Sequence, residues 1–180
     1  MRPIIYTLIL LLLNTLLVHG QDNDDIDFNI KIQEISLVNV VPNNQVISFD
    51  VSVASTVGEE FPTQYNSSKW LNYTSTHSSF SPLKIIKAHI GGGSLPTGIA
   101  LYLKVDAATG NGAGHLGIPA GQIKLNNSPQ TVLSCIGGAY TGRGKNNGHR
   151  LNYSVEILDY EQLTSVHNKK YVVYYTLLED

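Results

Sequence analysis

Residues 99–106 read IALYLKVD, a run in which apolar and mostly polar side chains alternate one by one. The same alternation recurs in ISFDVSV at residues 47–53 and in LNYSVEI at residues 151–157. Successive side chains of a β-strand point to opposite faces of a sheet, so a strand with one buried face shows this period of two. The three stretches therefore predict half-buried β-strands.

Weaker strand candidates occupy the intervals between these stretches. They lie at residues 26–32, 35–41, 69–74, 83–90, 122–125 and 131–136. Residues 171–178 are apolar on both faces, which favours a central strand or one that is covered on its second face. Glycine and proline clusters separate the candidates, and no long stretch has helical periodicity. The pattern predicts an all-β antiparallel domain of about eight or nine strands, arranged as a two-sheet sandwich or as a barrel.

The N-terminus has the composition of a secretory leader. Arg2 precedes an apolar run at residues 4–18, and small residues close the run at Gly20. The run is shorter than the ~20 apolar residues that a membrane span needs, although an uncleaved anchor is the alternative. We expect a signal peptide at residues 1–20, no stable membrane insertion after its removal, and a secreted protein in the periplasm or at the cell surface.

The chain after this leader changes strand register near its start. Apolar side chains alternate through residues 26–32, and the phase then slips at residues 33–34. A one-residue slip moves apolar side chains to the other face, so either a bulge lies here or two segments pack against different surfaces. We expect an N-terminal arm or first strand at residues 21–33 and a single β-sandwich domain at residues 34–180. The arm would form the domain's own first strand or add to a neighbouring subunit's sheet. Its candidate partner-strand contacts are Ile26, Phe28, Ile30 and Ile32.

Charge and cysteine content exclude some classes of partner and cross-link. Loss of Arg2 with the leader leaves 11 basic against 14 acidic side chains, which argues against nucleic acid or anionic lipid as a broad electrostatic partner. Cys135 is the single cysteine, so an intramolecular disulfide is excluded. A disulfide-free exported domain favours a bacterial source. Because Cys135 alternates with apolar neighbours, we expect a buried, inert thiol.

Four stretches together carry a resemblance to a known group of proteins. They are KWLNYTS at residues 69–75, GGGSLPTGI at 91–99, IGGAYTG at 136–142 and the last strand with its acidic end at 171–180. Over residues 35–180 the chain resembles exported proteins of Bacteroidota-type bacteria that have an immunoglobulin-like or fimbrial-subunit-like (pilin-like) β-sandwich and mostly lack an assigned function. The resemblance implies surface or periplasmic residence and a structural or adhesive role, and it transfers no catalytic residue. The chain departs from related subunits in having neither a disulfide nor an N-terminal cysteine for lipid attachment.

The motifs for catalysis and cofactor binding fail their spacing tests. Residues 112–117 match GxGxxG, but Pro119 follows where a helix would have to meet the phosphates. Residues 142–145 lack the glycine spacing and the hydroxyl of a phosphate loop. The histidines are far apart, which favours surface or turn positions over a zinc site. We therefore expect no enzyme activity, no cofactor and no metal.

Two groups of side chains are candidates for ligand binding. Trp70 and Tyr73 would either stack on sugar rings or belong to the core. A basic cluster in a glycine-rich hairpin loop runs from Arg143 to Arg150 and includes Lys145. It would either contact an acidic sugar or phosphate group or remain a solvated loop tip. The candidate ligand contacts are Trp70, Tyr73, Arg143 and Lys145.

Two classes of function follow from these observations. The first is a secreted, non-catalytic structural or adhesive module, in the manner of a fimbrial-like surface subunit, which would join copies of itself or other surface subunits by strand addition. The second is a carbohydrate-binding module that uses exposed aromatic residues to hold glycans.

Overall fold

The computed structural model describes residues 28–50, 56–78, 81–164 and 169–180. The chain divides into two units, residues 1–32 and Gln33–Asp180. Within the first unit only residues 28–32 are described, so the expected signal peptide and Ile26 lie outside the described residues.

The described part of the second unit consists of β-strands and loops, with no helix. Its nine strands are β1 (Ser36–Val41), β2 (Gln64–Ser75), β3 (Lys84–Gly91), β4 (Ile99–Thr109), β5 (Ala113–Pro119), β6 (Gln122–Lys124), β7 (Gln130–Tyr140), β8 (Gly148–Ile157) and β9 (Val172–Glu179). All the strand pairs are antiparallel. The predicted all-β antiparallel fold is confirmed at this level.

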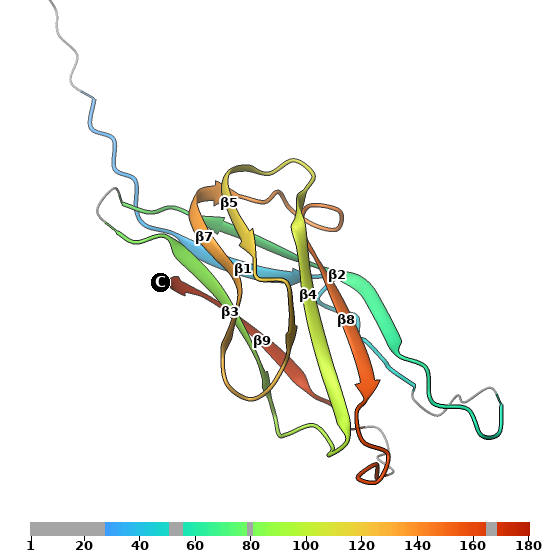
Figure 1. Cartoon of the computed structure of the whole chain (residues 1–180). Helices are drawn as coiled ribbons and strands as arrows, with labels where there is room; N and C mark the ends of the chain where they lie inside the picture. The colour runs from blue at the N-terminus through green and yellow to red at the C-terminus, as the bar shows by residue number, and fades with distance from the viewer. Residues whose placement is uncertain (1–27, 51–55, 79–80, 165–168) are drawn as a thin grey trace, which may run out of the picture. The chain divides into compact units, whose positions relative to one another are not determined.

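Hydrogen bonds join the strands into one open sheet with the order β6-β4-β8-β2-β7-β3-β9 (Figure 1). β1 pairs with β2 and β5 pairs with β7, outside this order. The long strand β2 has three partners: its first part pairs with β8, its second part with β1, and its last two residues, Thr74 and Ser75, with β7. β2 is therefore the strand that connects the two ends of the sheet.

One apolar cluster forms the core of this unit. Leu71, Ile86, Leu103, Leu133 and Leu151 are completely buried, and each comes from a different strand. Burial of such a side chain contributes about 1.5–3 kcal/mol, so contacts of this kind hold the strands together in a chain without a disulfide. Within residues 99–106 the alternation has the predicted result at Leu103, which is buried, and Lys104, which is exposed, whereas Ala100 on the predicted outer face is also buried.

Three strand predictions are corrected by the structure. Residues 47–50, the described part of one predicted strand, have no strand structure, although Ile47 and Phe49 pack against the core. Residues 28–32 are not a strand either. β9 is neither central nor covered on its second face, because it lies at the end of the sheet order, and Val172 and Tyr174 on that face are 50% and 51% exposed.

Strand β5 is present where the sequence predicted only a glycine-rich turn. Gly114 and Gly117 lie in this strand with φ angles of 91° and 78°. A Cβ at Gly114 would lie 2.1 Å from the Gly138 carbonyl oxygen. Glycine is therefore required by the close approach of β5 to β7, and its frequency here does not mark a turn.

The expectation of a buried Cys135 is wrong, because a β-bulge reverses the side-chain direction there. The pairing of β3 with β7 shifts between Lys84↔Ile136 and Ile86↔Leu133, so β7 advances by three residues while β3 advances by two. Leu133 and Ile136 are both buried, whereas Cys135 is exposed and has a φ of 56°. The extra residue of a bulge leaves the alternation of the strand, which is why the thiol points outward.

Candidate functional site

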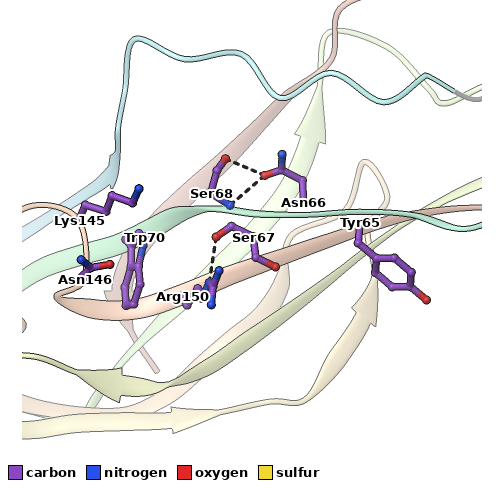
Figure 2. A pocket seen from close by; sticks show the side chains of 8 residues that line it. All are labelled: Tyr65, Asn66, Ser67, Ser68, Trp70, Lys145, Asn146 and Arg150. Atoms are coloured by element: carbon purple, nitrogen blue, oxygen red, sulfur yellow. Dashed lines mark hydrogen bonds between the residues drawn. The ribbon is translucent and has the colours of Figure 1, made fainter.

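An open concave surface lies where β2 and β8 meet the loop that precedes β8 (Figure 2). It is a pocket of about 540 Å³, wide open to solvent, which we call the β2–β8 pocket. Figure 2 shows Lys145 near one end and Tyr65 at the other, with Arg150 between them. The residues that line it are Tyr65, Asn66, Ser67, Ser68, Trp70, Lys145, Asn146 and Arg150.

A second β-bulge shapes the floor of the pocket. The pairing of β2 with β8 shifts between Asn66↔Tyr153 and Lys69↔Leu151, so the β2 segment contains one extra residue. The side-chain oxygen of Asn66 accepts hydrogen bonds from the Ser68 backbone N–H at 3.0 Å and from the Ser68 hydroxyl at 2.7 Å (Figure 2). This local turn fixes the bulge and presents polar groups of β2 at the surface.

The loop that carries Lys145 is held by the amide of Asn72, a buried side chain of β2. Asn72 Nδ2 donates to the carbonyl oxygen of Asn147 at 2.6 Å, and its Oδ1 accepts from the Gly144 N–H at 2.8 Å. Asn147 Nδ2 in turn donates to the Arg143 carbonyl oxygen at 3.0 Å. Both sides of the loop are therefore anchored, and Lys145 projects from a fixed backbone.

The charge of the pocket is positive and uncompensated. Lys145 and Arg150 are exposed, and Arg150 Nε donates to the Ser67 carbonyl oxygen at 3.0 Å, which orients the guanidinium over the bulge. None of the lining residues is acidic. Within the described ranges the single ion pair joins Lys84 to Glu34, so neither cation of the pocket has a carboxylate partner there.

The predicted ligand contacts are only partly brought together. Trp70 and Lys145 both line the pocket, whereas Arg143 is exposed outside its lining. Trp70 is only 8% exposed, so most of this side chain is buried, and its remaining exposed edge lies in the pocket wall. Tyr73 is 4% exposed and lies in the core, where it offers no aromatic face to a ligand.

Several lining residues were missed as candidates in the sequence. Tyr65 is 75% exposed and supplies the accessible aromatic ring that was sought at Trp70 and Tyr73. Arg150 was noted only as part of the basic cluster, and Asn66 and Ser67 were not among the candidate ligand contacts. Pairing of Tyr65 with Ser154 across β2 and β8 brings together residues that are far apart in the chain, and nothing in a single sequence reveals that pairing.

His149 is completely buried, contrary to the expectation of a surface or turn position. Its Nδ1 lies 2.8 Å from the Asp106 carbonyl oxygen, and its Nε2 lies 3.0 Å from the Leu116 carbonyl oxygen and 3.3 Å from the Tyr73 hydroxyl. The His149 and Tyr73 rings are stacked with centroids 5.8 Å apart. Burial lowers the pKa of His149, and the two backbone contacts oppose that shift. The ring therefore links β8 to β2, β4 and β5 inside the molecule.

The N-terminal candidates have a different environment. Phe28, Ile30 and Ile32 are 81%, 85% and 80% exposed and belong to no strand. Across the described ranges, no three side chains of the metal-binding types come together, and no helix has the length and hydropathy to cross a membrane. No protein-family model matches the chain, and no curated protein or solved structure is significantly similar to it.

Proposed function

We propose that this protein is a secreted, non-catalytic structural or adhesive module, a fimbrial-like surface subunit that joins its neighbours by strand addition. The observation that carries the proposal is the alternation of apolar side chains at residues 28–32 on a segment that belongs to no strand. The resemblance to exported Bacteroidota-type proteins supports the same role and the bacterial cell surface or periplasm as its location.

The N-terminal segment has the composition of a strand that needs a partner. Phe28, Ile30 and Ile32 would share one face of an extended chain, and Asn29 and Lys31 would share the other. Three large apolar side chains that are each at least 80% exposed forfeit their hydrophobic stabilisation. Burial of each would contribute about 1.5–3 kcal/mol, which favours insertion of this face beside a sheet.

The edge of β9 fits the role of acceptor. β9 pairs with β3 along eight residues and with no other strand of the described chain, so its far edge carries no strand pairing there, although β1 lies close to β9. Val173, Tyr175 and Leu177 of β9 pack against the core. An added strand with one apolar and one polar face would continue both faces of β9.

In the arrangement that we propose, the nine strands fold over the common core as the two layers of an immunoglobulin-like or pilin-like sandwich. Two observations support this. β2 would belong to both layers, because it pairs with β8 along one part and with β7 and β1 along another. In addition, side chains from β3 and β7 share one apolar cluster with side chains from β4 and β8.

Replacing the apolar face of the segment tests strand addition. The triple variant Phe28→Ser, Ile30→Ser, Ile32→Ser should be monomeric in light scattering under conditions in which the wild-type protein associates, with an unchanged circular dichroism spectrum. The matched control Asn29→Ser, Lys31→Ser changes the polar face of the same segment and should associate normally.

A deletion of residues 21–32 provides a second variant that spares the contacts of the folded unit. It stops before Gln33, whose carbonyl oxygen accepts from the Thr76 hydroxyl at 3.0 Å, and before Glu34, which pairs with Lys84. The proposal would be contradicted if the triple serine variant or the deletion variant associated to the same extent as the wild type. It would also be contradicted if the wild-type protein remained monomeric at all concentrations.

A further inference from the structure

Independently of strand addition, we infer that the β2–β8 pocket is a binding site for an anionic carbohydrate polymer, with Lys145 and Arg150 holding its acidic groups. The inference rests on the placement of two unneutralised cations among hydroxyl, amide and aromatic groups in one open groove. Nothing in the strand-addition role uses these residues.

The cations point to an acidic ligand because no group of the described chain neutralises them. The whole chain has a formal net charge of −2, so the pocket is a positive site on a slightly acidic protein. The net charge of the chain therefore supplies no overall attraction for a polyanion. An anion that binds must do so through local contacts, and Lys145 and Arg150 supply them.

The geometry suits carboxylate or sulfate groups. Arg150 uses its Nε in the bond to the Ser67 carbonyl oxygen, which leaves its terminal N–H groups to form paired hydrogen bonds with a planar or tetrahedral oxyanion. Lys145 supplies a second charge from a loop whose backbone is fixed by Asn72. Because both anchors exist before a ligand arrives, binding would cost little ordering of the protein.

The remaining lining residues favour a carbohydrate over other polyanions. Ser67, Asn66 and Asn146 present short hydroxyl and amide groups of the kind that exchange hydrogen bonds with sugar hydroxyls. Tyr65, at the other end of the pocket from Lys145 in Figure 2, offers an exposed ring face for stacking on a sugar. The groove is open rather than enclosed, which fits a polymer that crosses the surface better than a small molecule that must be surrounded.

Affinity electrophoresis through gels containing defined polymers tests this site. Dextran sulfate presents sulfate groups and polygalacturonate presents carboxylate groups. Neutral dextran has the backbone of dextran sulfate without its charge, and polyglutamate is an anionic polymer without sugars. We expect the wild-type protein to be retarded by one or both acidic polysaccharides, and retarded little by dextran or polyglutamate. Retardation by dextran sulfate alone would assign sulfate, and by polygalacturonate alone carboxylate, as the recognised group.

Two sets of variants assign any binding to the pocket. Lys145→Gln with Arg150→Gln should weaken binding about tenfold, as expected for the loss of two exposed charge-assisted contacts. The matched control Lys124→Gln with Lys170→Gln removes the same charge from exposed lysines outside the pocket and should bind as the wild type does. Tyr65→Ala should weaken binding to the polysaccharide, and since Tyr65 is 75% exposed this variant should fold normally.

Three results would overturn the inference. They are no retardation by any polymer, equal loss of binding in the Lys124/Lys170 control, and retardation by polyglutamate equal to that by the polysaccharides. The oligomeric state of the pocket variants should match that of the wild type, so failure of this inference leaves strand addition untouched, and the reverse also holds.

Discussion

At the residue scale, Lys84 is a charged side chain that is almost completely buried in the described part of the chain. The residue is 1% exposed, and its Nζ lies 2.7 Å from the Ser36 hydroxyl, 2.8 Å from the Thr76 carbonyl oxygen and 2.9 Å from a carboxylate oxygen of Glu34. It thereby joins β3 to the start of β1 and the end of β2. A buried ammonium group is tolerated only when its N–H groups all find acceptors, and here they do.

Replacement of this lysine should cost far more stability than loss of its acidic partner. Lys84→Met keeps the aliphatic stem but leaves buried acceptors without a donor, so we expect a loss of about 2–4 kcal/mol in the free energy of unfolding. Glu34 is 43% exposed, and Glu34→Gln should cost less than about 1 kcal/mol because solvent screens the pair. Urea denaturation measures both, and equal losses for the two variants would contradict this account.

His149 makes stability depend on pH. Burial lowers its pKa below the ordinary 6.5, so the folded chain binds fewer protons than the unfolded chain as the pH falls. The neutral ring therefore contributes stability that is complete above the unfolded pKa and decreases once the pH falls below about 6.5. The urea concentration at the unfolding midpoint should therefore decrease as the pH is lowered below about 6.5. A His149→Gln variant should be less stable and less pH-dependent, and an equally steep pH dependence would show that another group is responsible.

At the scale of elements, the β7 bulge places Cys135 in the left-handed region of backbone space. A β-branched residue is strongly disfavoured there, whereas asparagine is tolerated. Cys135→Val should therefore be about 1–2 kcal/mol less stable than Cys135→Asn. Thermal and urea unfolding of the two variants can be compared directly because Cys135 is exposed and neither substitution fills or empties the core. Equal stabilities would mean that the bulge relaxes in solution.

The same elements show where sequence patterns succeed and where they fail. β4 and β8 were predicted because simple alternation coincides with one apolar face that is mostly buried, although the opposite face is itself partly covered. β5 escaped prediction because its glycines serve close packing against β7, and glycine carries no alternation. At Cys135 the apolar alternation looks regular in the sequence, yet the bulge reverses it, since a bulge arises from pairing with other strands and leaves no local pattern.

At the scale of the whole molecule, the candidate site could be predicted only in pieces. Trp70 and Lys145 were each recognised as candidates, but for different reasons and in different hypotheses. Their meeting depends on the pairing of β2 with β8, which joins Trp70 to Arg150. The deeply buried polar side chains His149 and Lys84 were not recognised as buried, because acceptors from separate segments offset their burial and only the folded chain brings those segments together.

The position of β2 also has a consequence for the order in which the fold can be completed. Tyr65 of β2 is opposite Ser154 of β8, and Thr74 is opposite Tyr140 of β7. During synthesis β2 therefore emerges long before most of its partners, and until they arrive Leu71 has no core to enter. Strand pairs between residues so distant along the chain form slowly. Until they form, a nascent chain with an unpaired apolar strand is prone to aggregate. Folding of this protein should depend on protection of the β2 segment until residue 157 has been made.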